Sequence, residues 1–453
     1  MKNKLKSEQL IPLSFLIAII IGTVILMLPV STADGKGTDV ITALFTATTS
    51  LCVTGLVVVD TYAYWSLFGK IIILIMIQLG GLGIITVMSV MMLAVHRKMT
   101  LGHMVVLHDA FNLSTISGLK KFLAKVFLST LAVEGLGGII YCIRFIPQFG
   151  VGRGIWYSFF TAISAFCNAG IDIIGPNSLI DYNTDYLIIF NTSMLIILGG
   201  LGYVVWFDIA GTFINGIRKK YSFGLICKRF SEHTKLVLNL TFFLLLFGTV
   251  GIFAMEYTNA ETIGNMGIGG KLLNSFFQSV TFRTAGFAAV PQSSLTNGSC
   301  ALGLLLMFVG GSPVGTAGGV KTITFFVVVL NAVSYIRSRK ETVVFSRRIS
   351  DELIQKSTAI LTVSFAITFI MLVLLLTTNK VDMVDALYET FSATATVGLS
   401  RSLTPTLNPV GKIIIIICMY LGRIGPISMA LFFKYHGAEK NNISFVKGNY
   451  FVG

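Results

Sequence analysis

The sequence predicts an all-α, polytopic membrane protein with eight transmembrane helices, arranged as four parallel repeats around a pseudo-fourfold central axis. Two observations predict this fold class, and the first is composition. Of the 453 residues, 54% are hydrophobic and only 12% are charged, which is about half the charged fraction of an ordinary soluble protein. The second is a series of eight apolar runs, compared with the roughly 20 residues that cross a bilayer. The runs lie at about 10–30, 69–95, 122–146, 185–212, 236–255, 301–335, 358–378 and 411–433.

The first apolar run follows Lys2, Lys4 and Lys6 and so has the charge pattern of a signal peptide. Its apolar stretch is longer than the roughly 7–15 residues of a signal-peptide core. We therefore predict a retained transmembrane helix.

Charge distribution predicts the topology. Lys and Arg cluster in alternate loops, at 96–98, 120–121, 218–220, 228–229 and 337–348, whereas the loops between them are acidic. By the positive-inside rule, the basic loops and both termini are cytoplasmic. The net charge of +14 is thus a topology signal that also attracts anionic membrane lipid, and no nucleic-acid partner is expected.

An internal repeat places one short segment, too brief to cross the bilayer, between the two apolar runs of each pair. In all four segments an aromatic residue stands ten residues before a glycine: Phe45 before Gly55, Phe160 before Gly170, Phe276 before Gly286 and Tyr388 before Gly398. The glycines recur every 112–116 residues, as expected for structural repeats. We assign the repeats to 1–98, to 99–222, to 223–345 with a broken inner helix, and to 346–453 with the C-terminal tail. All four segments fall in acidic loops, so the repeats are parallel and favour a central pore over an inverted-repeat carrier.

The four short segments predict a cation filter made of re-entrant loops. Non-helical backbone at membrane depth is tolerated where it lines a water-filled cavity, and the helix before each glycine would direct its negative C-terminal end at a cation. Only the glycine is common to the aligned stretches, so backbone carbonyls are the predicted ligands of a monovalent cation. The predicted filter residues are Cys52, Val53, Thr54 and Gly55; Cys167, Asn168, Ala169 and Gly170; Arg283, Thr284, Ala285 and Gly286; and Ala395, Thr396, Val397 and Gly398.

The third inner helix carries more glycine and proline than a continuous helix tolerates. We predict a loop beneath the filter that obstructs the pore and moves when the pore opens. The alternative is a static kink that permits close helix packing. The predicted gate residues are Gly310, Gly311, Ser312, Pro313, Gly315, Thr316, Ala317, Gly318 and Gly319, together with Arg423.

Two arginines lie at membrane depth. Arg423 is predicted to face the pore below the filter and to contact the glycine-rich loop, and the alternative is that it snorkels to the cytoplasmic face. Arg283 is predicted to point away from the pore and to brace the third filter stretch against a carboxylate, with Asp385 or Glu389 as partner. The alternative for both acids is solvation at the outer surface or attraction of cations to the entrance.

These motifs resemble the Ktr/Trk/HKT superfamily of potassium transporters, most closely its KtrB-type membrane subunits, over essentially the whole chain. The most specific pieces are Val53–Leu56, Phe166–Gly170, Arg283–Phe287, Gly310–Gly319 and Leu421–Pro426. Trk-type members carry additional N-terminal helices, whereas the first apolar run here begins within about ten residues of Met1, which favours the Ktr branch. In plant-type relatives a serine at the first filter glycine accompanies sodium selectivity. Since this chain has Gly55, the resemblance implies that K+ binds the filter residues and is transported, with Na+ as a stimulating ion.

The resemblance also implies an assembly. It implies a multi-pass homodimer in the bacterial plasma membrane, with one pore per subunit. A cytosolic nucleotide-binding regulatory ring of the KtrA type would dock on the basic loops near 97–120, 214–235 and 336–356. Nucleotide is expected only on that partner, and no cofactor is expected in this chain.

Other function classes are less well supported. The sequence has no His-Glu-x-x-His motif and no serine elbow, so an enzyme is not expected. A carrier with alternating access and a sodium pathway are the two alternatives within transport. Flux per molecule and its voltage dependence distinguish the carrier, and competition between K+ and Na+ distinguishes the sodium pathway.

Overall fold

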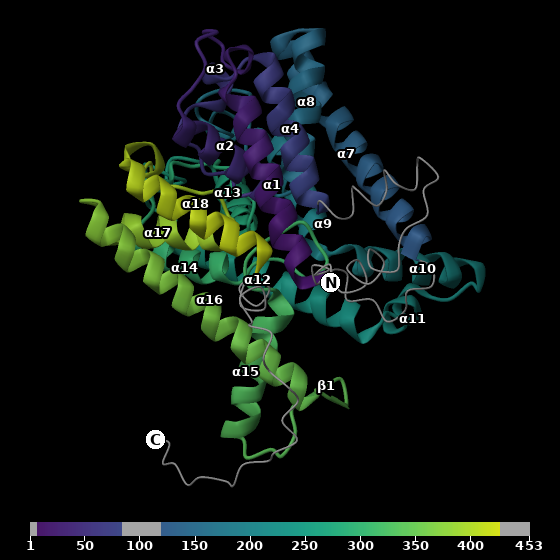
Figure 1. Cartoon of the computed structure of the whole chain (residues 1–453). Coiled ribbons are helices and arrows are strands. Elements are labelled where there is room, and N and C mark those ends of the chain that lie inside the picture. Colours follow the sequence, from purple (N-terminus) through teal and green to yellow (C-terminus); the bar gives the residue numbers. More distant parts are fainter. Residues whose placement is uncertain (1–6, 84–118, 426–453) are drawn as a thin grey trace, which may run out of the picture.

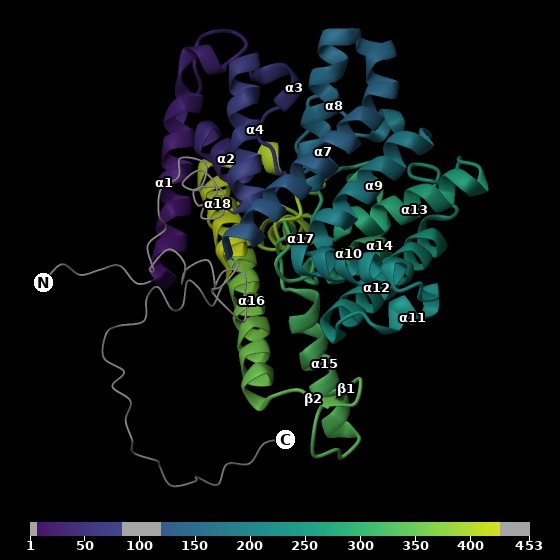
Figure 2. The same cartoon turned by 90° about the vertical axis from the view of Figure 1, so that its right-hand side faces the viewer.

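The structure is a computed structural model that describes residues 7–83 and 119–425, and these residues are almost entirely helical (Figure 1). The predicted helical class is confirmed. Within the described residues, the sheet content is one two-stranded antiparallel hairpin, β1 (Val343–Val344) and β2 (Arg347–Arg348). The hairpin projects at the end of the molecule opposite α3 (Thr61–Tyr64) (Figures 1 and 2).

A long outer helix, a short helix and an inner helix follow one another four times along the described chain. The outer helices are α1 (Ser7–Met27), α7 (Leu119–Phe149), α12 (Glu232–Glu256) and α16 (Asp351–Thr378). The short helices, here termed pore helices, are α2 (Val40–Cys52), α8 (Val151–Phe166), α13 (Ile268–Phe282) and α17 (Met383–Thr394). The inner helices are α4 (Leu67–Leu82), α9 (Tyr186–Leu201), α14 (Asn297–Phe308) and α18 (Pro409–Ile424). The remaining helices are α10 (Tyr203–Arg218), α11 (Phe223–Lys228), α15 (Thr322–Ile336) and the 3-10 turns Pro29–Ser31, Ile180–Tyr182, Gln292–Ser294 and Thr404–Thr406.

Side-chain caps set where the inner helices begin. A side-chain oxygen at the residue before each inner helix accepts a hydrogen bond from a backbone N–H of the first turn, which satisfies a donor that the helix itself leaves free. These capping residues are Ser66, Asp185, Thr296 and Asn408. The outer end of each inner helix is therefore determined locally by its sequence.

Packing between the four helix triplets closes a ring. Each inner helix packs against the pore helix of the next triplet, in the pairs α4 with α8, α9 with α13, α14 with α17, and α18 with α2. The last pair brings the end of the described chain back to its beginning, and Figures 1 and 2 both show α18 beside α2. The cyclic order of these contacts is that of a pseudo-fourfold axis.

Glycines end three of the inner helices. Gly83, Gly202 and Gly425 have φ of 82°, 89° and 88°, a region that side chains other than glycine rarely adopt. After Gly202 the chain resumes as α10, bent by 97° from α9, so the apolar run at 185–212 forms two helices rather than one. The third inner helix is interrupted as predicted, between α14 and α15. The ends of the runs 69–95 and 411–433, and most of the loop 97–120, lie outside the described residues.

Several helices have the length and composition of membrane spans. Helices α12 and α16 and the segment 121–149 of α7 can each cross a bilayer, and the bent pair α9–α10 adds a broken span. The shorter apolar helices are Pro12–Met27, Val40–Cys52, Leu67–Leu82, Asn297–Phe308 and Thr322–Ile336. Outer helices expose large apolar side chains, such as Ile21 on α1, Phe242 on α12 and Phe369 on α16. An exposed apolar surface of this extent fits contact with lipid.

Candidate selectivity filter and gate

The four pore helices lead into the same backbone turn. The residue two positions before each aligned glycine has a left-handed φ: Val53 at 55°, Asn168 at 60°, Thr284 at 70° and Thr396 at 51°. In three of these turns the next N–H bonds a carbonyl five residues back, as in a Schellman motif, with distances of 2.9 Å from Thr54 to Thr49, 2.8 Å from Ala169 to Ser164 and 2.7 Å from Val397 to Ser392. The third turn is one residue tighter, with Ala285 bonding Thr281 at 3.1 Å. Non-glycine residues hold this conformation where their surroundings over-determine it.

The aligned glycines form a closed ring. A Cβ added to Gly55 would lie 2.5 Å from the Ala169 carbonyl oxygen, one added to Gly170 would lie 2.5 Å from that of Ala285, and one added to Gly286 would lie 2.8 Å from that of Val397. A Cβ on Gly398 would overlap the Thr54 carbonyl oxygen, which returns the order to the first stretch. Glycine is required at these four positions because there is no space for a Cβ atom. It is also required because φ lies in the left-handed region, at 64–102°. The ring gathers four carbonyl oxygens, one per stretch, which are ligands of the type that replaces the hydration shell of a cation.

Hydroxyl groups from the pore helices hold each filter stretch. Thr49 Oγ1 and Ser392 Oγ accept hydrogen bonds from the N–H groups of Gly55 and Gly398, both at 3.0 Å. In the other two stretches the hydroxyl donates to the carbonyl just after the glycine, from Ser164 to Ile171 at 2.5 Å and from Thr281 to Phe287 at 2.7 Å. Each pore helix therefore fixes the backbone at its own glycine.

The predicted carboxylate brace of Arg283 is wrong. Arg283 is buried, and its Nη2 donates to the Gly310 carbonyl at 3.4 Å. Asp385 pairs with Arg401, and Glu389 accepts hydrogen bonds from hydroxyl groups. Arg283 follows the last residue of α13, where the negative end of the helix dipole favours a cation. It thus connects the third filter stretch to the start of the glycine-rich loop rather than to an acid.

A small cavity lies beside Arg283. Its lining includes Ile196, Thr241, Val280 and Gly311. Arg283 Nε and Thr241 Oγ1 are buried with no hydrogen-bond partner in the part of the chain that the structure describes. The cavity therefore has two buried polar groups at its edge that the described residues leave without a partner, as they do the hydroxyl groups of Thr54, Thr284 and Thr396.

The loop between α14 and α15 belongs to the third helix triplet and contacts both the second and the fourth triplets. It folds back on itself, since the Gly310 N–H donates to Val320 O at 3.0 Å. The Ser312 and Thr316 N–H groups donate to the carbonyls of Gly200 and Gly199 at 2.9 and 3.1 Å. Gly318 lies directly against the side chain of Thr396 in the fourth filter stretch. The predicted gate residues are therefore packed against the inner helix of one triplet and the filter of another.

Arg423 is held by backbone carbonyls from two other triplets. Its Nη1 donates to Thr316 O in the glycine-rich loop at 2.6 Å, and its Nη2 donates to the carbonyls of Gly80 and Gly81. These contacts place the guanidinium against the glycine-rich loop, and it does not snorkel away. Lys321 Nζ, at the end of the same loop, donates to Ala317 O at 2.5 Å.

Sequence reasoning missed a buried polar cluster behind the second filter stretch. Glu134, on α7 and 3% exposed, accepts a hydrogen bond from Gln78 Nε2 at 3.1 Å. The Cys167 thiol lies 3.7 Å from the other carboxylate oxygen. A carboxylate inside an apolar run is rare and usually functional, so Glu134 within the run at 122–146 was the available signal.

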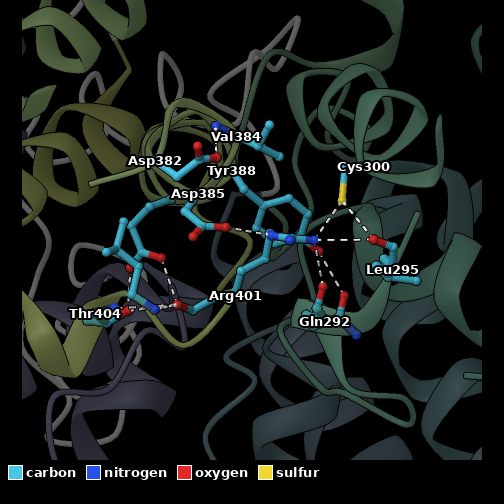
Figure 3. Close-up of polar contacts among 12 residues, drawn as sticks. Gln292, Leu295, Cys300, Asp382, Val384, Asp385, Tyr388, Arg401 and Thr404 are labelled. Atoms are coloured by element: carbon cyan, nitrogen blue, oxygen red, sulfur yellow. Dashed lines mark hydrogen bonds and ion pairs between the residues drawn. The ribbon is translucent and has the colours of Figure 1, made fainter. Parts of the chain in front are cut away.

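Arg401 was also missed, and it joins the outer ends of the third and fourth filter stretches (Figure 3). Its Nε pairs with Asp385 of α17 at 2.7 Å, while its Nη1 donates to Gln292 O at 3.1 Å and to Cys300 Sγ at 3.0 Å. Tyr388 of α17 adds a hydrogen bond to Gln292 Oε1 at 2.7 Å. The sequence signal that could have identified Arg401 was a basic residue three positions after the fourth aligned glycine.

We expect Arg401→Met to lower the free energy of unfolding by about 1.5–3 kcal/mol, because several hydrogen bonds to a charged group are lost. Thermal denaturation in detergent measures the change. The matched control is Arg347→Met, whose ion pair with Glu232 is exposed, with side-chain exposures of 76% and 44%, and should contribute little. Equal losses in the two variants would contradict a bracing role for Arg401.

Metal-type side chains do not supply a competing cation site. No group of three or more His, Cys, Asp or Glu residues suited to a metal ion occurs within residues 7–83 and 119–425.

Comparison with known proteins decides the family. The TrkH family model, described as a cation transport protein, matches residues 9–443. The chain belongs to the TrkH family. TrkH-family proteins are transporters, so the expectation that the chain is not an enzyme is confirmed. The chain is 38% identical to the Ktr system potassium uptake protein B of Bacillus subtilis, covering 98% of this chain and 96% of that protein.

Two further matches extend the comparison. The potassium/sodium uptake protein NtpJ of Enterococcus hirae is 33% identical over 97% of this chain and 96% of its own. The crystal structure of the potassium transporter TrkH from Vibrio parahaemolyticus has a TM-score of 0.76 at 15% identity, covering 96% of this chain and 86% of that chain. That structural match carries the helical membrane-transporter fold of the TrkH family to this chain.

Proposed function

We propose that this protein is the ion-translocating membrane subunit of a bacterial potassium uptake system. K+ passes through the ring formed at Gly55, Gly170, Gly286 and Gly398, where backbone carbonyls take the place of water ligands. The closed cyclic order of these glycines is the observation that carries the proposal. The name of the Bacillus subtilis relative, a potassium uptake protein, supports K+ as the ion.

Gating in this proposal uses the loop from Gly310 to Gly319. The loop contacts the second inner helix, the fourth filter stretch and Arg423. Displacing it would release these contacts together, which suits a gate with two discrete positions. A static kink would leave the loop in place during conduction.

The proposed assembly is a homodimer with a cytosolic nucleotide-binding ring of the KtrA type. The basic cytoplasmic loops near 97–120, 214–235 and 336–356 are its docking sites in this proposal, and Na+ acts as a stimulating ion. The Bacillus subtilis relative is named as protein B of a Ktr system, which supports a multi-component assembly.

A sodium pathway is the second candidate function. It is favoured by the name of the Enterococcus hirae relative, which includes both potassium and sodium. Uptake of K+ and of Na+ into proteoliposomes at a set membrane potential separates the two candidates. We expect K+ flux to exceed Na+ flux and K+ to inhibit Na+ entry by competition. Na+ flux that is equal or larger in folded protein would overturn the K+ assignment.

A further inference from the structure

Glu389 is a completely buried carboxylate on the fourth pore helix, with a relative exposure of 0%. One of its oxygens accepts a hydrogen bond from Ser400 Oγ at 2.7 Å, and the other accepts one from Thr404 Oγ1. Ser400 stands two residues after the filter glycine Gly398. The carboxylate is therefore tied to the chain at the point where the fourth filter stretch ends.

The same face of the pore helix holds the filter glycine itself. Ser392, three residues after Glu389, accepts the hydrogen bond from the Gly398 N–H at 3.0 Å. Residues three apart lie on one face of a helix. Glu389 and Ser392 thus hold two successive parts of one filter stretch, the glycine and the chain that follows it.

Hydrogen bonding favours the ionised form of Glu389. Both of its oxygens act as acceptors from hydroxyl groups, and an ionised carboxylate is an acceptor at both oxygens. Charge-assisted hydrogen bonds of this type are stronger than neutral ones. Complete burial opposes a charge on this carboxyl, and the two charge-assisted hydrogen bonds act against that cost, so the contacts are compatible with a negative charge behind the filter.

Among the residues that the structure describes, Glu389 forms no ion pair, whereas the neighbouring Asp385 does. Asp385, one turn earlier on α17, is paired with Arg401 at 2.7 Å (Figure 3). In the other three repeats, the residue nine positions before the glycine is Thr46, Thr161 or Phe277. The fourth stretch is therefore the one with a carboxylate at this position.

We propose that Glu389 sets the cation affinity of the filter by supplying a fixed negative charge behind the outer end of the fourth stretch. This inference rests on the proposed function of the glycine ring. A buried charge is screened little by salt, so its field acts on an ion held by the nearby carbonyls. The carboxylate attracts the ion without binding it directly.

The test is Glu389→Gln, which removes the charge and retains an acceptor for one hydroxyl group. We expect the KM for K+ to rise about ten-fold, the effect of one unit charge acting over about 10 Å at an effective dielectric constant of about 20. Maximal flux should remain near that of the wild type, whereas thermal stability should fall modestly because one charge-assisted hydrogen bond is lost. A structural strut alone would change stability and maximal flux and leave KM unchanged.

Glu256→Gln is the matched control. Glu256 is also 0% exposed and is also held by hydroxyl groups, those of Thr262 and Thr296, but it ends the outer helix α12. Its substitution should leave KM unchanged. An unchanged KM in Glu389→Gln, or an equal shift in the two variants, would overturn the inference.

Asp385→Asn keeps the test decisive if Glu389→Gln does not fold. This substitution leaves the charge of Arg401 unbalanced beside Glu389 and should also raise KM, and an unchanged KM would overturn the inference. Wild-type flux in the same vesicles separates the two proposals. If the wild type conducts K+ and both variants keep the wild-type KM, only the role of Glu389 is overturned. If folded wild-type protein conducts no K+, the proposed function and this inference are both overturned.

Discussion

Gly55→Ser is expected to lower discrimination between K+ and Na+ by at least about ten-fold. Gly55 has a φ of 102°, and a left-handed conformation costs other residues about 1–2 kcal/mol. An added Cβ would also lie 2.5 Å from the Ala169 carbonyl oxygen and 3.2 Å from Gly398 Cα. The neighbouring carbonyls would have to move, and they are the proposed ion ligands. The ratio of K+ to Na+ uptake in proteoliposomes measures the effect.

Gly150→Ser separates backbone strain from damage to the ring. Gly150 also has a positive φ, 79°, but nothing lies within 4 Å of an added Cβ. It is the N-cap of the pore helix α8, at the end of that helix away from the aligned glycine Gly170. Selectivity should stay at the wild-type value in this variant. Wild-type selectivity in Gly55→Ser as well would contradict the assignment of the glycine ring as the filter.

Arg423→Gln is expected to raise the maximal K+ flux about ten-fold. The change removes a positive charge proposed to lie below the filter, and a unit charge at about 10 Å opposes a cation by about 1.7 kcal/mol at an effective dielectric constant of about 20. It also weakens the hydrogen bond from Arg423 to Thr316 O, now 2.6 Å long, that holds the glycine-rich loop. Current through planar bilayers, recorded as a function of voltage, measures both effects.

Deleting residues 316–318 tests the loop independently of the charge. The deletion removes the bonds from Thr316 to Gly199 O and Phe166 O, so flux should rise here too. Arg337→Gln is the control, since Arg337 is exposed at the end of α15. Wild-type flux in both the folded deletion variant and Arg423→Gln would contradict a gate at this position.

Local signals predicted the helices and the repeated turn. The apolar runs and the spacing of the aligned glycines are properties of the sequence itself, so they can be read without the fold. The interrupted third inner helix was visible for the same reason, because Gly310–Gly319 is incompatible with a continuous helix.

Specific side-chain contacts could not be read in this way. Arg283 bonds a carbonyl of the loop after α14, and Asp385 pairs with Arg401. Neither pair follows a sequence spacing from which the contact could be predicted. The break at Gly202 was missed because Gly199–Gly202 also suits close helix packing, and only the 97° bend distinguishes the two. The contacts of Glu134 were missed because Gln78 and Cys167 lie 56 and 33 residues away along the chain, and no sequence pattern links them.

The contact between α18 and α2 means that a single polypeptide encircles the proposed ion path. A pore assembled from identical chains must repeat every substitution at each position around its axis. Here each quadrant can diverge alone, which explains how one quadrant carries the glycine-rich loop and another carries Glu389 while the glycines stay common. Mutations in this protein therefore perturb one quarter of the ring at a time, and the four quarters can be dissected separately in a way that a homotetramer does not allow.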